Sequence, residues 1–461
     1  MPKSRPLMAA LLFGWSALPV VSYADDEVST LRAELNALKQ EHANQVSALE
    51  ARIDEIEAEQ RAAAALVTPA NTPPANTARG GASAFNPAIS MIITGNYANL
   101  SADPSTYRIA GFLPSGSEIG PGERSFNLNE SELTVSANVD PYFFANVTAS
   151  VTADNEIAIE EAYFRTLALQ SSFTMKGGRF FSGLGYLNES HSHAWDFVNQ
   201  PLVYQAFFDS QLAQDGLQVK WLAPTDTFLE FGAEAGNGDS FPGTRRNRNG
   251  LNSQALFTHV GGDIGDSTSW RAGLSWHNAH SDDRPYDDLD AFDASVVNAF
   301  TGTSRTWVVD ALMKWAPHGN ATRHQLKLQG EYMRRAEDGQ LEFDTLGTNL
   351  SGDYRSHQSG WYVQGVYMFQ PRWRIGARYD AMDSGNPSIA LVQSGALSSS
   401  AFPALLSATP ERFTIMLDWS PSEFSRLRAQ YAWDEARLDE RDRQFLLQYI
   451  YAIGAHGAHK F

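Results

Sequence analysis

The sequence of 461 residues contains no cysteine, which excludes disulfides, thiolate metal sites and thiol nucleophiles. Beyond residue 25 it has no run of 18 apolar residues, so no segment predicts a membrane-spanning helix. Basic residues are also scarce. The 35 Lys and Arg stand against 53 Asp and Glu, a net charge of −18 that argues against nucleic acid as a partner. A chain with these absences can still span a membrane as a β-barrel, because the strands of a barrel are apolar on only one face.

The first 24 residues have the pattern of an export signal. Lys3 and Arg5 precede an apolar run over 7–21, and small residues around Ala24 suit cleavage there. Removal of 1–24 as a signal peptide leaves 33 basic and 53 acidic residues, a net charge of −20. We expect the mature protein to lie outside the inner membrane.

Residues 25–61 predict a periplasmic coiled coil. The stretch 27–60 holds no Pro or Gly and carries one apolar stripe, with a stutter at His42 that locally unwinds a coil. Such a stripe needs partner helices, and three of them would form a trimer, although a solvated single helix is the alternative. The stripe consists of Val28, Leu31, Leu35, Leu38, Val46, Leu49, Ile53 and Ile56. Residues 62–84, with Ala, Pro and Gly runs, predict a flexible linker.

The remainder, 85–461, changes to a period of two. In 304–315, Trp307, Val309 and Trp315 share one face while Asp310 and Lys314 occupy the other. The segments 227–234 and 424–434 alternate in the same way. In a membrane barrel the apolar face meets lipid and the polar face lines the lumen.

The positions of proline in this region distinguish a membrane barrel from a soluble β-sandwich. An apolar strand end is followed by Pro141, Pro224, Pro317, Pro371 or Pro421, and the next strand starts within a few residues. The other connections are long and polar: 101–125, 181–211, 238–251, 279–303, 335–356 and 383–409. Tight turns at one end and long loops at the other are typical of an outer-membrane barrel, and Phe461 suits its terminal assembly signal.

Alternation and turns together predict a transmembrane antiparallel β-barrel of about sixteen strands. A barrel of this size leaves a water-filled channel rather than a packed interior. The strands are expected near 89–100, 126–139, 142–153, 156–168, 172–181, 212–223, 227–237, 252–262, 268–278, 304–316, 322–334, 357–369, 372–382, 411–420, 424–434 and 442–454.

The order of export signal, coiled coil, linker and barrel resembles the phosphate-selective porins of the O and P type. Glu161-Ala162-Tyr163 followed by Gly177-Gly178-Arg179-Phe180 is similar to that group's strand-turn-strand before the constriction loop. The resemblance spans nearly the whole chain and implies a trimeric diffusion channel with its third loop folded inward. One departure is charge, because 85–461 holds 28 basic and 43 acidic residues where that group's anion path is basic.

Strand parity predicts the residues that line the pore. An acidic wall on the early strands would face a basic wall on strands thirteen to fifteen, giving a transverse field that filters solutes by charge and dipole. The simpler alternative is that these charges only solvate a wet lumen and pair with each other. The expected residues are Glu130, Glu132, Glu161, Glu230, Glu234, Arg372, Arg374, Arg378, Arg412, Arg426 and Arg428.

The connection 181–211 is the predicted constriction loop, because its aromatic residues need burial against the barrel wall. It contains His191, His193, Trp195 and Asp196. The two histidines are candidate ligands for a divalent metal, although a polar loop turn also explains them. A second, weaker group consists of His277, His280, Asp282 and Asp283.

The leading functional hypothesis is an outer-membrane porin of a Gram-negative bacterium, open to passive diffusion of small charged or polar solutes. Outer-membrane lipid is its surroundings and a homotrimer its expected assembly. No motif predicts an enzyme or requires a cofactor. An energised receptor is rejected, since it needs 22 strands and a plug domain. A metal-responsive uptake porin and a coiled coil that tethers the barrel to the envelope stay open.

Overall fold

The computed structural model describes residues 39–40, 87–116, 119–151, 156–244, 249–292 and 294–454. The chain divides into two units, 1–80 and 81–461, and the second unit holds the β-structure. The predicted signal peptide, linker and terminal Phe461 lie outside the described residues, as does the predicted coiled coil apart from helical Lys39 and Gln40. Across the described ranges, no helix is both long and apolar enough to span a membrane.

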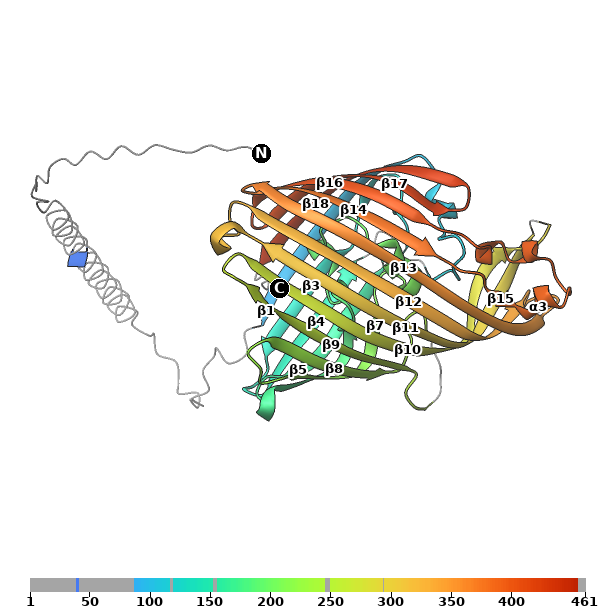
Figure 1. The fold of residues 1–461 in the computed structure, drawn as a ribbon, viewed down its shortest axis with the longest axis horizontal. Coiled ribbons are helices and arrows are strands. Elements are labelled where there is room, and N and C mark those ends of the chain that lie inside the picture. The colour runs from blue at the N-terminus through green and yellow to red at the C-terminus, as the bar shows by residue number, and fades with distance from the viewer. Residues whose placement is uncertain are drawn as a thin grey trace, which may run out of the picture. The chain divides into compact units, whose positions relative to one another are not determined.

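One antiparallel sheet closes on itself to form a barrel (Figure 1). Closure comes from pairing of the first strand with the last, from Ser90 opposite Gly454 to Leu100 opposite Gln444. The strands are β1 (Ala88–Leu100), β2 (Ser125–Leu128), β3 (Ser131–Asn138), β4 (Phe143–Val151), β5 (Ile157–Thr166), β6 (Phe173–Phe181), β7 (Ala213–Leu222), β8 (Phe228–Gly236), β9 (Ser253–Ile264), β10 (Thr268–Leu289), β11 (Ser295–Trp315), β12 (Gln325–Phe343), β13 (Leu350–Gln370), β14 (Trp373–Asp383), β15 (Ser388–Ile389), β16 (Glu411–Ser422), β17 (Ser425–Arg437) and β18 (Glu440–Gly454).

In the described residues the barrel itself has sixteen strands. β2 and β3 are two parts of one strand, because both pair with β1 on either side of a short break. β15 has only two residues and pairs with the far end of β13, outside the main ladder. Without these two extra segments, the eighteen strands of the sheet reduce to sixteen. The predicted antiparallel β-barrel and its strand number are therefore confirmed, while the predicted coiled coil stays a prediction.

Side chains alternate between a polar interior and an apolar exterior, as the period of two predicts. On β11, Trp307 and Val309 lie on the outer face and are 52% and 51% exposed, whereas Asp310 lies on the inner face and is 1% exposed. Aromatic rings gather near the proline turns, where Trp373 and Trp419 stack with centroids 5.7 Å apart. We call the end of the barrel that carries these tight turns the short-turn end.

Four consecutive strands extend well beyond the rest. β10, β11, β12 and β13 have 22, 21, 19 and 21 residues, and Figure 1 shows them reaching the end where β15 and α3 lie. The predictions of loops over 279–303 and 335–356 are therefore wrong over most of their length. Outside lipid, both faces of a strand can be polar, so the alternation that reveals strands elsewhere is weak there.

Most of the short helices in the described residues lie in the long connections between strands. α2 (Leu202–Phe208) lies in the predicted constriction loop, and all of its side chains are buried. The remaining helices are α3 (Ala390–Gln393) and the 3₁₀ turns η1 (Pro104–Thr106), η2 (Gln170–Ser172), η3 (Ser192–Ala194), η4 (Pro317–Gly319), η5 (Ser399–Ala401) and η6 (Pro403–Leu405).

Candidate functional site

A polar vestibule of about 1180 Å³ occupies the short-turn end of the lumen. Its walls come from strand segments next to the tight turns, and its inner end is formed by 186–196 of the loop that joins β6 to β7. We call residues 182–212 the constriction loop. A separate cavity of about 170 Å³ lies beyond α2, lined by the connection between β1 and β2. The vestibule is the larger of these two cavities.

The constriction loop has a closed neck. The Ser182 amide donates to the Leu212 carbonyl at 2.9 Å. The buried Asn188 Nδ2 donates to the carbonyls of Ser182 and Leu212 at 2.8 and 2.9 Å. The Leu212 amide returns a hydrogen bond to Asn188 Oδ1 at 2.8 Å. Glu234 accepts from the Ser182 hydroxyl and the Gly183 amide. These bonds fix the loop at its base, because each buried donor has a partner.

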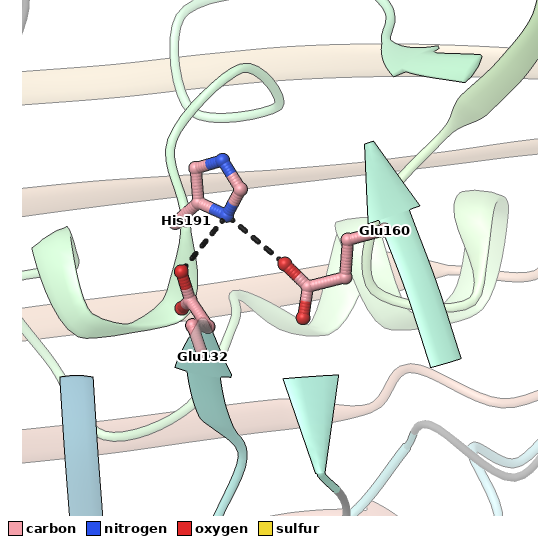
Figure 2. A group of neighbouring side chains, drawn as sticks. All are labelled: Glu132, Glu160 and His191. Carbon is pink, nitrogen blue, oxygen red and sulfur yellow. Dashed lines mark hydrogen bonds and ion pairs between the residues drawn. The ribbon is translucent and has the colours of Figure 1, made fainter. Parts of the chain in front are cut away.

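Two histidines attach the loop to the acidic wall, and Figure 2 shows one of them, His191, with Glu132 and Glu160. His191 Nδ1 lies 3.0 Å from Glu160 Oε2 and 3.3 Å from Glu132 Oε2. Its Nε2 lies 3.1 Å from Glu161 Oε2 on the other side of the ring. His193 Nδ1 lies 2.8 Å from Glu132 Oε1. Both imidazoles therefore share one group of carboxylates on β3 and β5.

A β-bulge explains why adjacent residues of β5 both face inward. The register with β4 pairs Thr148 with Glu161 and Ala149 with Ile159, which leaves Glu160 as the extra residue. Such an insertion re-aims a side chain that regular alternation would send to the other face. Sequence parity placed Glu161 in the lumen and overlooked Glu160. The available signal was that a carboxylate at Glu160 would otherwise face lipid at high cost.

The carboxylates also determine the charge of His191. Burial alone would lower the pKa of this imidazole, but hydrogen bonds to Glu132, Glu160 and Glu161 outweigh burial and hold the pKa well above its usual value. The ring is therefore an imidazolium at neutral pH when protons are its only ligands. In this form it donates from both nitrogens.

Asp196 attaches the same loop to the basic wall. Its Oδ2 lies 2.9 Å from Lys327 Nζ on β12, and its Oδ1 lies 2.9 Å from Arg374 Nη1 on β14. Burial would raise the pKa of Asp196, but the two cations lower it well below the ordinary carboxyl value. Lys327 was not identified from the sequence, although its lumen-facing parity on β12 was a usable signal.

The buried arginines hold the loop by its backbone. Arg378 Nη1 donates to the Asn199 carbonyl at 2.7 Å, and Arg412 Nη2 donates to the Gln200 carbonyl at 2.6 Å. Arg428 Nη2 donates to the Trp195 carbonyl at 2.8 Å. Guanidinium groups suit this role because their charge stays fixed and their donors reach several acceptors.

The structure separates the predicted pore-lining residues into distinct positions. Glu132, Glu161, Glu230, Arg374 and Arg426 line the vestibule, together with the loop residues His191, His193, Trp195 and Asp196. Four others are buried against the loop: Glu234, Arg378, Arg412 and Arg428. Glu130 is half-buried in the break between β2 and β3, and Arg372 lies in the turn before β14 with positive φ.

The middle of the lumen is packed with apolar side chains. We call this group the lumen cluster: Ile109, Phe112, Leu184, Leu187, Leu202, Val203, Tyr204, Ala206, Phe207, Phe208, Leu212, Val308, Met333, Tyr362, Met382 and Ala436. Phe207 of α2 packs against Phe112 with ring centroids 6.0 Å apart, and Arg335 lies 4.4 Å above the Phe207 ring. The expectation of an open, water-filled interior therefore applies to the vestibule, while the described loops fill the middle.

Glu331 is a further anchor that sequence reasoning missed. It accepts hydrogen bonds from the Tyr186 and Leu187 amides and from the hydroxyls of Tyr204 and Tyr362. It thereby joins the start of the loop, α2 and the wall. The second predicted histidine group is not assembled as a metal site, since buried His277 bonds Ser253 Oγ and packs edge-on against Phe208.

No protein-family model matches the chain. Its structure is similar to a loop L8 deletion mutant of OmpT, an outer membrane protein of Vibrio cholerae, with 11% identity, a TM-score of 0.49 and coverage of 80% and 99% of the two chains. It is also similar to OprB of Pseudomonas putida, with 14% identity, a TM-score of 0.44 and coverage of 80% and 94%. A third similar structure is an anion-selective porin from Comamonas acidovorans, with 9% identity, a TM-score of 0.47 and coverage of 80% and 99%.

A relative is also found by sequence. A protein of Aquifex aeolicus (strain VF5), which bears only the name "Uncharacterized protein", is 31% identical over 359 residues. The match covers 74% of this chain and 71% of the relative. The chain therefore belongs to the same protein family as this Aquifex aeolicus protein.

Proposed function

We propose that the protein is an outer-membrane porin for the passive diffusion of small polar or charged solutes. The observation that carries this proposal is a charge-lined vestibule inside a barrel whose outside is apolar. An apolar exterior suits lipid, and a polar lumen suits hydrated solutes. Selection would come from the size and charge of the path rather than from chemistry.

The charges that line the vestibule favour anions, whereas the negative net charge of the whole chain suggests a preference for cations. Its lining includes eight basic and six acidic side chains. The basic ones are Arg165, Lys176, Lys220, Arg271, Lys314, Lys327, Arg374 and Arg426, and the acidic ones are Glu132, Glu161, Glu189, Asp196, Glu230 and Asp263. A solute that enters from the periplasmic side meets these vestibule charges first, so we expect a weak preference for anions. A channel specialised for phosphate would show this anion preference in a stronger form.

Passage requires movement of the constriction loop. The lumen cluster lies between the vestibule and the opposite end, and α2 contributes three of its five aromatic side chains. We therefore propose that the described arrangement is a closed or narrow state and that displacement of α2 widens the path.

Planar-bilayer recording tests the function. Purified protein is expected to give discrete conductance steps, and replacement of 202–208 by a Gly-Ser segment is expected to increase step size at least twofold. Reversal potentials in a KCl gradient measure anion preference, and exchange of chloride for phosphate tests the specialisation. Absence of steps from both the parent and the loop variant, in protein shown by its circular dichroism to be folded, would reject the channel.

We further propose a homotrimer in the outer membrane of a Gram-negative bacterium, with the N-terminal segment in the periplasm. Support comes from the apolar stripe over 27–60 and from the position of Ala88 and Gly454, which both lie at the short-turn end. Light scattering of detergent-solubilised protein with and without 27–60 tests the assembly. Unchanged trimer mass combined with loss of envelope attachment would favour the tether instead.

A further inference from the structure

The acidic wall of the vestibule holds two carboxylates and one imidazole nitrogen at the spacing of metal ligands. Figure 2 shows Glu132 and Glu160 meeting the same nitrogen, Nδ1 of His191. One oxygen of each carboxylate and this nitrogen lie within 4.8 Å of one another. Their Nδ1 to oxygen distances are 3.3 and 3.0 Å. Ligands about 2.1 Å from a tetrahedral Zn²⁺ lie roughly 3.4 Å apart, so little movement would admit an ion.

We propose that Glu132, Glu160 and His191 bind one divalent transition-metal ion of the Zn²⁺ class. Imidazole and carboxylate together suit Zn²⁺ and its neighbours better than Mg²⁺ or Ca²⁺, which prefer oxygen alone. The ion would take the place of the proton on Nδ1. With three protein ligands, a coordination position remains for water or for a solute in the vestibule.

Neighbouring groups orient two of the three ligands, as built metal sites require. His191 Nε2 lies 3.1 Å from Glu161 Oε2, and an Nε2–H donated to that carboxylate would leave Nδ1 for the ion once its proton has been displaced. His193 Nδ1 lies 2.8 Å from Glu132 Oε1 and so turns the other oxygen of Glu132 toward the site. The sequence pair His191 and His193 is thus divided into one ligand and one positioning residue.

An independent observation also indicates a missing cation. The Glu160 side chain is only 10% exposed, and no backbone amide, hydroxyl or cation of the described residues donates to its buried Oε1, because its neighbour is another carboxyl group, that of Glu130. A buried carboxylate oxygen without a partner is costly, and a bound cation removes that cost. The Glu130 carboxyl lies beside Glu160 and hydrogen-bonds to it, so without a cation the two carboxyl groups hold one proton between them. The ion-pair partners of Glu132 and Glu160 are histidines, which a metal can convert into ligands or outer-shell groups.

Such an ion would fasten the constriction loop to the barrel wall. Glu132 belongs to β3, Glu160 to β5 and His191 to the loop, so one ion would join three segments that are distant in sequence. The inference does not depend on the channel function, because an ion can bind whether or not solutes pass.

The experiment is isothermal titration calorimetry of the full chain in detergent after removal of metals with EDTA, with Zn²⁺, Mn²⁺ and Mg²⁺ as separate titrants. We expect one Zn²⁺ per chain. Glu160→Gln keeps the shape of the side chain and should weaken Zn²⁺ binding at least 100-fold, and Glu161→Gln should weaken it about tenfold. His191→Ala should abolish binding.

A matched control lies on the same vestibule. His259 and Glu230 also form an imidazole–carboxylate pair, with Nδ1 and Oε1 3.3 Å apart, but Lys220 lies 3.5 Å from the same oxygen. Glu230→Gln should leave Zn²⁺ affinity within twofold of the parent. The proposal is overturned by a parent that shows no saturable Zn²⁺ binding, by equal affinity in Glu160→Gln and the parent, or by Mg²⁺ binding as tight as Zn²⁺. Circular dichroism and heat-modified gel mobility confirm that each variant is folded.

Discussion

Asp196 and His191 lie five positions apart on one loop and hold opposite walls of the barrel. His191 contacts Glu161 on β5 at 3.1 Å, and Asp196 contacts Lys327 on β12 at 2.9 Å. Six strands, β6 to β11, lie between β5 and β12, so the two are seven steps apart, which is close to half of the sixteen-stranded circumference. The loop carries positive charge to the acidic wall and negative charge to the basic wall. The transverse charge separation predicted for the pore thus serves to suspend the loop.

Removal of the Asp196 charge should loosen the loop. Asp196→Asn leaves Lys327 and Arg374 without their shared carboxylate, and we expect a loss of about 1–3 kcal/mol in the free energy of unfolding, because both cations retain some access to water. Conductance should become larger and noisier. Urea unfolding in lipid vesicles and bilayer recording measure the two effects. Asp263→Asn, on the same vestibule but exposed, should change neither.

The Asp196 anchor should be insensitive to pH over the physiological range. Its pKa is lowered in the folded protein, so its contribution to stability is present above the ordinary carboxyl pKa of about 3.9 and is lost as pH falls through the lowered value. The difference in unfolding free energy between parent and Asp196→Asn should therefore be constant from pH 5 to pH 8. A change of more than about 0.5 kcal/mol in that difference over this range, measured by urea unfolding, would contradict the assignment.

Truncation of Phe207 should open the lumen cluster. The side chain is fully buried between Phe112 and Arg335, so Phe207→Ala should cost about 3–5 kcal/mol of stability, less if α2 collapses into the space. If α2 obstructs the path, the same variant should raise single-channel conductance. Phe292→Ala is the control, because Phe292 is 89% exposed and should leave stability and conductance unchanged.

A charge placed on the outer surface should identify the lipid belt, the band of the barrel wall that contacts lipid. Val309 lies on the apolar outer face of β11, and Val309→Arg should reduce the free energy of folding into vesicles by about 2–4 kcal/mol. Ser351→Arg, on the exposed far part of β13, should cost less than about 0.5 kcal/mol. Equal and small effects of both substitutions would place Val309 outside the membrane.

The strands within the lipid belt could be read from the sequence because each has one apolar and one polar face. The predicted strand 227–237 corresponds to β8 at 228–236, and both the fold and the strand number follow from such segments. The far halves of β10 to β13 could not be read, since a strand in water needs no apolar face. His280, Asp287 and Asp288 of β10 therefore had the composition of a loop.

The contacts of the candidate site were less accessible to sequence reasoning. Parity identified Glu132 and Glu161, but the bulge at Glu160 depends on how β5 pairs with β4. Parity also placed Arg378 and Arg412 on the inner face, whereas their binding of loop carbonyls depends on the path of the loop in three dimensions. Histidine spacing indicated a metal, and only the fold shows which nitrogen meets which carboxylate.

The unequal strand lengths give the barrel an oblique rim. At about 3.3 Å per residue, the 22 residues of β10 run roughly 70 Å, while the 9 residues of β8 run roughly 30 Å. With strands inclined by about 40°, one side of the wall stands on the order of 30 Å taller than the other. At that end the long strands consequently raise one flank of the wall, and the shorter strands leave the other flank low. A molecule that approaches from the side of β8 meets a lower wall than one that approaches from the side of β10 to β13.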